Sequence, residues 1–138
     1  MIMETQCGPV RTKYVLVVDD DIEFALTYQA LLQVHGYRVS TATDGSQALK
    51  LVLNSNVDAI LCDLRMPELT GDLFYVEVGR ARPHLQRRFI FITGYADDPI
   101  YETFLKNVKA PVLCKPISID HLLGKLRAVL GSEARAAK

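Results

Sequence analysis

Apolar residues fall into two patterns that alternate along the chain. Short runs rich in β-branched and aromatic residues, bounded by turn residues, are typical of β-strands. Longer stretches in which apolar residues recur three or four positions apart indicate helices with one buried face. The pattern predicts five strands, which cover residues 14–18, 37–41, 57–62, 89–93 and 112–114.

Capping residues locate the ends of the helices between these strands. Gly36 follows the first periodic stretch and suits a left-handed C-cap, while Asp44 and Gln47 have the spacing of a capping box. Asp98 before a proline and Ser118 before an apolar stretch mark two later helix starts. The predicted helices cover about residues 22–35, 44–53, 71–81, 98–108 and 118–130.

Strands that alternate with helices are typical of α/β proteins, in which right-handed crossovers cover both faces of a parallel sheet. Three of the runs are continuously apolar, as central strands of such a sheet should be, whereas residues 37–41 are more polar and suit an edge. The predicted fold is therefore a doubly wound five-stranded parallel sheet flanked by five helices. In such sheets, ligands bind at the carboxyl ends of the strands.

The length of 138 residues fits one domain and leaves no room for a second, effector domain. We expect the domain at residues 14–130, after a flexible N-terminal segment at residues 1–13. Residues 131–138 are small and charged without an apolar face, so we expect a flexible C-terminal tail there.

The composition argues against several classes of partner. Sixteen basic and sixteen acidic residues cancel, so no net field draws the chain to nucleic acid or to an anionic membrane. The apolar runs are too short to span a membrane, and the N-terminus lacks the apolar core of a signal peptide. Cys7, Cys62 and Cys114 match neither a disulfide framework nor a zinc site. We therefore expect a cytoplasmic protein without nucleic-acid or membrane partners.

A basic run follows the third predicted helix and contains Arg80, Arg82, His84, Arg87 and Arg88. Without aromatic residues or a helix that could read a groove, such a run is only a weak indication of nucleic-acid binding. We interpret it as a solvated loop opposite the expected site.

Acidic residues follow two of the buried strands. Asp19, Asp20 and Asp21 come directly after the first strand, and Asp63 follows the third. Taken alone, the first cluster is explained by helix capping. At one sheet edge, however, the two sets would form a hard-oxygen site that suits Mg²⁺. Without a counter-charge, these carboxylates would raise one another's pKa.

Two further polar side chains lie at strand ends. Thr93 ends the fourth strand and Lys115 follows the fifth, and each taken singly is an ordinary strand threonine or surface lysine. Together, a hydroxyl donor and an ammonium group can hold phosphoryl oxygens while a metal offsets the developing charge. The ordered set of acids, hydroxyl and lysine therefore predicts a site that accepts a phosphoryl group.

The chain resembles the receiver domains of two-component response regulators over about residues 14–130. The likeness rests on V-L-V-V-D-D at 15–20, D-L-R-M-P-E-L-T-G at 63–71, I-T-G at 92–94 and K-P at 115–116. It implies the flavodoxin-like receiver fold of chemotaxis regulators. It also implies a signalling protein that catalyses only its own phosphorylation and dephosphorylation.

This resemblance assigns the phosphoryl group to Asp63 as acceptor, with Thr93 and Lys115 holding it. It also implies a cis peptide bond between Lys115 and Pro116, since X-Pro bonds tolerate that isomer.

The resemblance implies Mg²⁺, or Mn²⁺, as cofactor. Asp20 and Asp63 would ligate the metal together with the backbone carbonyl of Arg65. Asp19 would reach it directly or through water.

The phosphodonor implied by the resemblance is a histidine kinase or a histidine phosphotransfer protein. The implied output surface is the face of helix four, strand five and helix five, at about residues 98–108, 112–114 and 118–130. We expect a downstream protein to bind through this face, and a phosphorylation-dependent homodimer formed through it is a further hypothesis. In the family, an aromatic residue three positions before the lysine takes part in the switch, but here that position is Val112. A valine cannot make the aromatic swing, so the output mechanism stays open.

Two other functions remain open. Because of Val112, the domain could act as a scaffold that binds constitutively, without phosphorylation. Asp19 and Asp21 have the spacing of the acidic pair in phosphatases of the haloacid dehalogenase type, but the further acidic pair of those enzymes is missing after Lys115. A flavodoxin-like FMN carrier is disfavoured because three acids stand where its phosphate-binding loop should begin.

Overall fold

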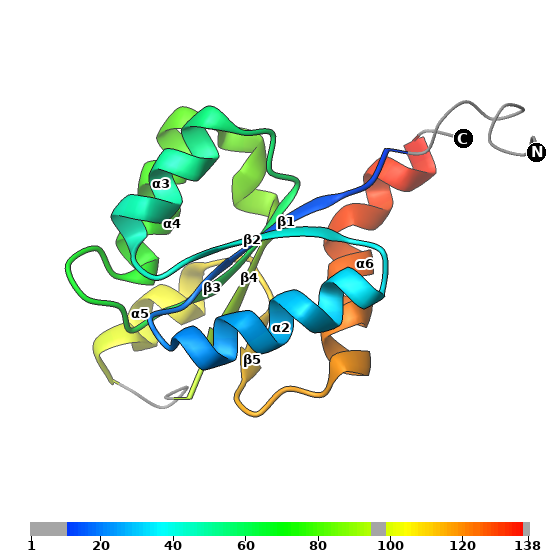
Figure 1. Ribbon diagram of the computed structural model, residues 1–138. Coiled ribbons are helices and arrows are strands. Elements are labelled where there is room, and N and C mark those ends of the chain that lie inside the picture. The colour runs from blue at the N-terminus through cyan, green and yellow to red at the C-terminus, as the bar shows by residue number, and fades with distance from the viewer. Residues whose placement is uncertain (1–10, 95–98, 137–138) are drawn as a thin grey trace, which may run out of the picture.

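The computed structural model describes residues 11–94 and 99–136, with side chains up to Gly131. Five parallel strands form one sheet in the order β2-β1-β3-β4-β5, with helices on both faces (Figure 1). The strands are β1 (Tyr14–Val18), β2 (Arg38–Ala42), β3 (Ala59–Asp63), β4 (Phe89–Thr93) and β5 (Val112–Cys114). The helices are α2 (Ile22–Val34), α3 (Gly45–Asn54), α4 (Gly71–Ala81), α5 (Pro99–Asn107) and α6 (Ile119–Ala136), with a 3₁₀ helix, η1 (Pro83–Arg88). This arrangement confirms the predicted doubly wound α/β fold.

Alternate residues of the central strands face two separate apolar cores. Leu16, Val18 and Ile60 pack with α3, α4 and α5, whereas Val15 and Val17 pack with α2 and α6. All residues of β1, β3 and β4 are buried, which explains why these runs are continuously apolar. The more polar β2 is an edge strand, as its composition predicted.

The helices begin at the predicted capping residues where the structure describes them. The Asp21 side chain accepts a hydrogen bond from the Phe24 backbone N–H, and Asp44 does the same for Gln47. Gly36 has a φ of +93°, a left-handed conformation in which glycine avoids the strain that a side chain would cause. Local side-chain chemistry therefore determines where α2 and α3 begin and where the chain leaves α2.

Some element bounds differ from the prediction. The backbone of α6 continues to Ala136, past the predicted end near Leu130, because alanine, glutamate and arginine in this stretch favour a helix even without an apolar face. The interpretation of residues 83–88 as a loop was wrong, because these residues form η1. The side chain of Leu85, in the middle of η1, is buried. The predicted helix start at Asp98 and the residues before Arg11 lie outside the described residues, and the domain boundaries stay a prediction.

None of the helices in the described part of the chain is both long and apolar enough to cross a lipid bilayer.

Candidate functional site

The carboxyl ends of β1, β3, β4 and β5 meet at one edge of the sheet. Asp19 follows β1 and Asp63 ends β3, and the two strands pair in register through Val18 and Cys62. Asp19 and Asp63 are only 1% and 6% exposed, whereas Asp20 is exposed. The parallel topology therefore brings together acids that are more than forty positions apart in the sequence.

Asp19, Asp20 and Asp63 form a compact carboxylate cluster. Each contributes one oxygen, and these oxygens lie within 4.8 Å of one another. Two backbone contacts hold Asp19 in place, since its N–H donates to the carbonyl of Ala42 and its Oδ1 accepts from the N–H of Asp21 at 2.9 Å. The geometry is that of an acidic pocket that could hold a metal ion.

Lys115 reaches this cluster from the end of β5. Its Nζ lies 2.8 Å from Asp19 Oδ2 and 3.9 Å from Asp63 Oδ2. Its backbone N–H donates to the carbonyl of Thr93, which ties the ends of β4 and β5 together. The peptide bond from Lys115 to Pro116 is cis, as the resemblance implied. Lys115 therefore supplies the positive charge that the acids require.

Two aromatic residues of α2 support Lys115, and the sequence analysis missed this role. The Nζ of Lys115 lies 4.3 Å from the ring centroid of Phe24, a cation–π contact. The Phe24 and Tyr28 rings pack with centroids 4.5 Å apart, and the Tyr28 hydroxyl donates to the carbonyl of Ile117. The sequence showed both residues as core positions of a helix, and only the packing of α2 against the loop after β5 reveals the second function.

Asp63 has a pKa raised to about 7. Burial is the main cause, and the negative charge of Asp19 adds to it, while Lys115 opposes the shift. For Lys115, burial lowers the pKa, but Asp19 and Asp63 outweigh this effect and the net shift is upward. The lysine is therefore a stable cation, whereas the charge of Asp63 depends on its surroundings.

The loop after Asp63 folds closely back on the strand. The N–H of Gly71 donates to the carbonyl of Leu64, and a side chain at position 71 would place its Cβ 2.4 Å from the Asp63 carbonyl oxygen. Only glycine allows this approach. Arg65, the predicted carbonyl ligand, is exposed in this loop. The close approach of the loop explains why a glycine is needed where α4 begins.

The predicted site residues come together as expected from the strand order. Thr93 is fully buried, and the residue before it, Ile92, pairs with Asp63 in the register of β3 and β4. Val112 pairs with Phe91 and, like Phe104, is a partly buried residue that packs against one of the two cores. Tyr95, an aromatic residue two positions after Thr93, lies outside the described residues.

The carboxylate cluster fits a metal ion on its own chemistry. Asp19 Oδ2 is buried and lies 2.8 Å from the Lys115 ammonium group, and it has no further hydrogen-bond partner among the described residues. A carboxylate oxygen can accept from more than one partner, so a metal cation could bind here beside the lysine. Three carboxylates with waters in the remaining positions suit Mg²⁺.

Comparison with known proteins agrees with this geometry. Residues 15–127 match the family model of the response regulator receiver domain, and the chain therefore belongs to this family. Receiver domains are signalling modules of two-component systems and not classical enzymes. The predicted family and fold are thus confirmed.

Individual relatives show how far the similarity extends. The transcriptional regulatory protein ZraR of Escherichia coli (strain K12) is 35% identical over 116 residues, which are 84% of this chain and 26% of that protein. The chain thus spans about a quarter of the length of this relative.

Solved structures show the same fold. A CheY-like receiver domain protein from Methanospirillum hungatei JF-1 has a TM-score of 0.82 at 26% identity, covering 91% of this chain and 99% of its own. The receiver domain of the sensor histidine kinase PA1611 from Pseudomonas aeruginosa PAO1 has a TM-score of 0.78 at 29% identity, covering 88% and 99%. That second structure has a magnesium ion coordinated in its active site cleft.

Proposed function

We propose that this chain accepts a phosphoryl group on Asp63 and signals through contacts with other proteins. The observation that carries the proposal is the buried Asp63 carboxylate, which lies beside two other acids and 3.9 Å from the Lys115 ammonium group. An arrangement so unfavourable for carboxylates has no evident structural purpose, because apolar residues would stabilise the fold better.

The transfer step follows from these positions. A carboxylate oxygen of Asp63 attacks the phosphorus of a phosphohistidine, so that an O–P bond forms, the N–P bond breaks and the electron pair returns to the imidazole of the donor. Lys115 offsets negative charge on the phosphoryl oxygens, and the Thr93 hydroxyl donates a hydrogen bond to one of them. Asp63 must be ionised to attack, and its raised pKa makes a counter-cation necessary near neutral pH.

Mg²⁺ is the cation that fits the cluster, with Mn²⁺ as a substitute of the same ligand preference. Asp19, Asp20 and Asp63 would hold it, with the backbone carbonyl of Arg65 as a further ligand. The metal would supply positive charge against the phosphoryl oxygens.

The phosphodonor in this proposal is a histidine kinase or a histidine phosphotransfer protein. The signal leaves through the face formed by α5, β5 and α6, which correspond to helix four, strand five and helix five of the family, toward a downstream protein or a second copy. Since Val112 cannot swing, Phe104 on α5 is the aromatic residue that can respond, because its ring packs against Phe91, 5.3 Å between centroids, next to the end of β4.

A second candidate function rests on Val112, which stands where the family has an aromatic residue. If Val112 disables the output switch, the domain acts as a scaffold that binds its partner equally well with and without phosphate. This alternative predicts the same partner affinity for the phosphorylated and unphosphorylated protein.

The test of acceptor chemistry is the intact mass of the protein after incubation with acetyl phosphate and Mg²⁺. We expect one phosphoryl adduct in the wild type, none with Asp63→Asn and none in EDTA. Asp120→Asn, which changes an exposed acid at the start of α6, is the matched control and should be labelled normally. An unlabelled wild type, under conditions that label another receiver domain, would contradict the proposal.

A further inference from the structure

A cavity of about 320 Å³ opens at the amino-terminal edge of the sheet, at the opposite ends of the strands from Asp63. Among the described residues, its lining contains three arginines and a histidine, namely Arg11, Arg82, Arg88 and His84, and only one acid, Asp58. The volume is at the lower end of the range of small-molecule sites, and it equals the space of about ten water molecules. The cavity is therefore large enough for a compact organic or inorganic anion.

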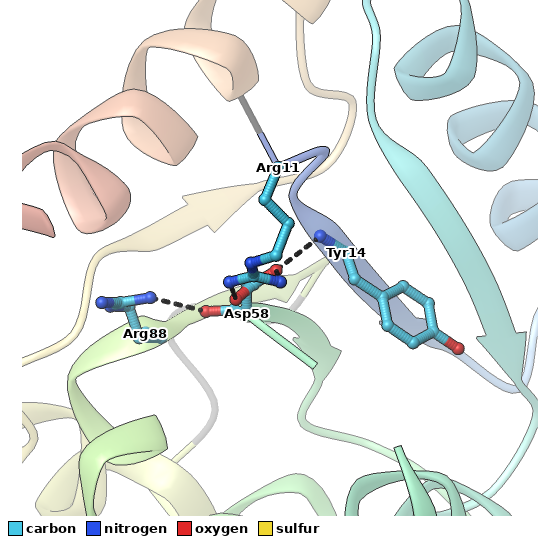
Figure 2. Close-up of polar contacts among 4 residues, drawn as sticks. All are labelled: Arg11, Tyr14, Asp58 and Arg88. Atoms are coloured by element: carbon cyan, nitrogen blue, oxygen red, sulfur yellow. Dashed lines mark hydrogen bonds and ion pairs between the residues drawn. The ribbon is translucent and has the colours of Figure 1, made fainter. Parts of the chain in front are cut away.

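The single acid of the cavity is already neutralised. Arg11 donates to both oxygens of Asp58, at 2.7 and 3.2 Å, and the backbone N–H of Tyr14 donates to one of them at 2.8 Å (Figure 2). Burial alone would raise the pKa of Asp58, but these partners outweigh it and the net shift is downward. Asp58 is thus a paired structural anion that offers little repulsion to a second one.

The remaining arginines are oriented by backbone carbonyls. Arg82 donates to the carbonyl of Leu53 at 3.0 Å. Arg88 donates to the carbonyl of Asp58 at 3.2 Å, as Figure 2 shows. A carbonyl carries no net charge, so the first bond positions Arg82 without neutralising it. Within the described residues, Arg82 forms no ion pair with a carboxylate. The two guanidinium groups are therefore held in place before any ligand arrives.

Two further cavities continue this basic lining along the same edge. One of about 390 Å³ shares His84 and Arg88 with the first and adds Arg87 and Lys109. Another, of about 380 Å³, again contains Arg87 and Lys109. The basic run that looked like a solvated loop in the sequence thus supplies side chains to three separate cavities at this edge.

We propose that the first cavity binds a compact anion with a diphosphate group, either free pyrophosphate or the diphosphate end of a nucleotide. The two guanidinium groups come from opposite ends of η1, since Arg82 directly precedes it and Arg88 is its last residue, while Arg11 is already paired with Asp58. Donors at different positions in the lining require acceptor oxygens that point in several directions. Two tetrahedral phosphate groups offer such oxygens, whereas a single planar carboxylate offers only two in one plane. In the part of the chain that the structure describes, no phenylalanine, tyrosine or tryptophan lines the cavity, which disfavours base stacking with single-stranded nucleic acid. This site is independent of phosphorylation at Asp63.

Isothermal titration calorimetry on the whole chain tests this proposal, with pyrophosphate, ADP, AMP and citrate as probes. EDTA is present throughout, so that no metal can attract these anions to the carboxylate cluster. We expect saturable one-to-one binding of pyrophosphate or ADP, at least tenfold tighter than binding of AMP or citrate. Tighter binding of ADP would identify the ligand as a nucleotide, and tighter binding of pyrophosphate would identify it as the free anion.

Two pairs of variants separate the cavity from general charge effects. Arg82→Gln should weaken binding at least tenfold, whereas Arg80→Gln, an exposed arginine paired with Glu77 outside the cavity, should change it less than twofold. Asn56→Asp adds a negative charge to the lining without changing its shape and should also weaken binding, while Asn54→Asp, just outside it, should not. Amide NMR shifts on ligand addition should centre on residues 55–58 and 82–88.

The proposal is overturned if none of the diphosphates binds, if citrate binds as tightly, or if Arg80→Gln and Arg82→Gln weaken binding equally. It is also overturned if the NMR shifts centre on Asp63.

Discussion

Asp58 and Asp63 lie at opposite ends of the same strand, and both are almost fully buried, at 7% and 6% exposure. Their pKa values nevertheless shift in opposite directions, downward for Asp58 and upward to about 7 for Asp63. The opposite pKa shifts are caused by the groups that surround each carboxylate. Asp58 has a bidentate arginine and a backbone N–H, whereas Asp63 faces a second acid and a lysine that is 3.9 Å away.

The difference shows that burial by itself does not identify a functional acid. Asp58 has the partners that a structural carboxylate needs, and it anchors the segment before β1 to the start of β3. Asp63 has weaker partners, a backbone hydrogen bond from Leu64 and the more distant Lys115 ammonium group, and these do not outweigh burial and the neighbouring acids. The same contrast holds for the two edges of the sheet, which are acidic at the carboxyl ends and basic at the amino ends although the chain as a whole is neutral.

The largest effect is expected when the positive charge at the acidic edge is removed. Lys115→Ala should slow phosphorylation by acetyl phosphate about 100-fold, because one preorganised donor to the phosphoryl oxygens is lost. Intact-mass time courses measure the rate. Lys50→Ala, on the exposed side of α3, is the control and should stay within a factor of about two of wild type. A Lys115→Ala rate close to wild type would show that the lysine is not part of the transfer site.

Asparagine substitutions of Asp58, which directly precedes β3, and of Asp63, which ends it, should change the free energy of unfolding with opposite sign. Asp58→Asn should lower the free energy of unfolding by about 2 kcal/mol, because charge-assisted hydrogen bonds to Arg11 are lost. Asp63→Asn should raise it by about 1 to 2 kcal/mol in EDTA, because repulsion and desolvation are relieved, with allowance for solvent screening. Urea unfolding at pH 8 measures both. If both variants changed the free energy of unfolding in the same direction, the contrast between the two acids would be contradicted.

The contributions of Asp58 and Asp63 to stability should also depend on pH in opposite ways. Because the pKa of Asp63 is raised to about 7, the folded chain holds more protons there than the unfolded chain between the ordinary value of 3.8 and about 7. Wild type should therefore lose stability relative to Asp63→Asn as the pH rises through this window. Because the pKa of Asp58 is lowered, its contribution should be lost only as the pH falls below about 4.

Unfolding midpoints of the wild type and both variants from pH 3 to 8, in EDTA, test these slopes. A difference between wild type and Asp63→Asn that does not change with pH would mean that Asp63 titrates normally in the folded chain.

The smallest effect is expected at the aromatic support of Lys115. Phe24→Leu keeps an apolar side chain but removes the cation–π contact, and should slow phosphorylation about two- to fivefold. Phe24→Tyr keeps a ring and should restore the rate, which a purely structural role would not explain. Equal rates for the leucine and tyrosine variants would refute the positioning role of Phe24.

The sequence pattern predicted most of the fold because strands and helix ends are specified by residues that lie close together in the sequence. Continuous apolar runs showed the buried strands β1, β3 and β4, and Asp44 and Gly36 marked helix ends through contacts within a few residues. The same strand ends located Asp63 and Lys115, since parallel strands place their carboxyl ends at one edge.

The sequence by itself therefore determined the class of fold and the edge of the sheet at which Asp19, Asp63, Thr93 and Lys115 lie. Only the tertiary structure decided which side chains actually pair. Arg11 and Asp58 are 47 positions apart, and Tyr28 and Ile117 are 89 apart, so no periodic pattern links them. Apolar burial is a property of each residue and repeats along the chain, whereas a pairing between distant polar groups depends on strand register and helix packing, which exist only once the chain has folded.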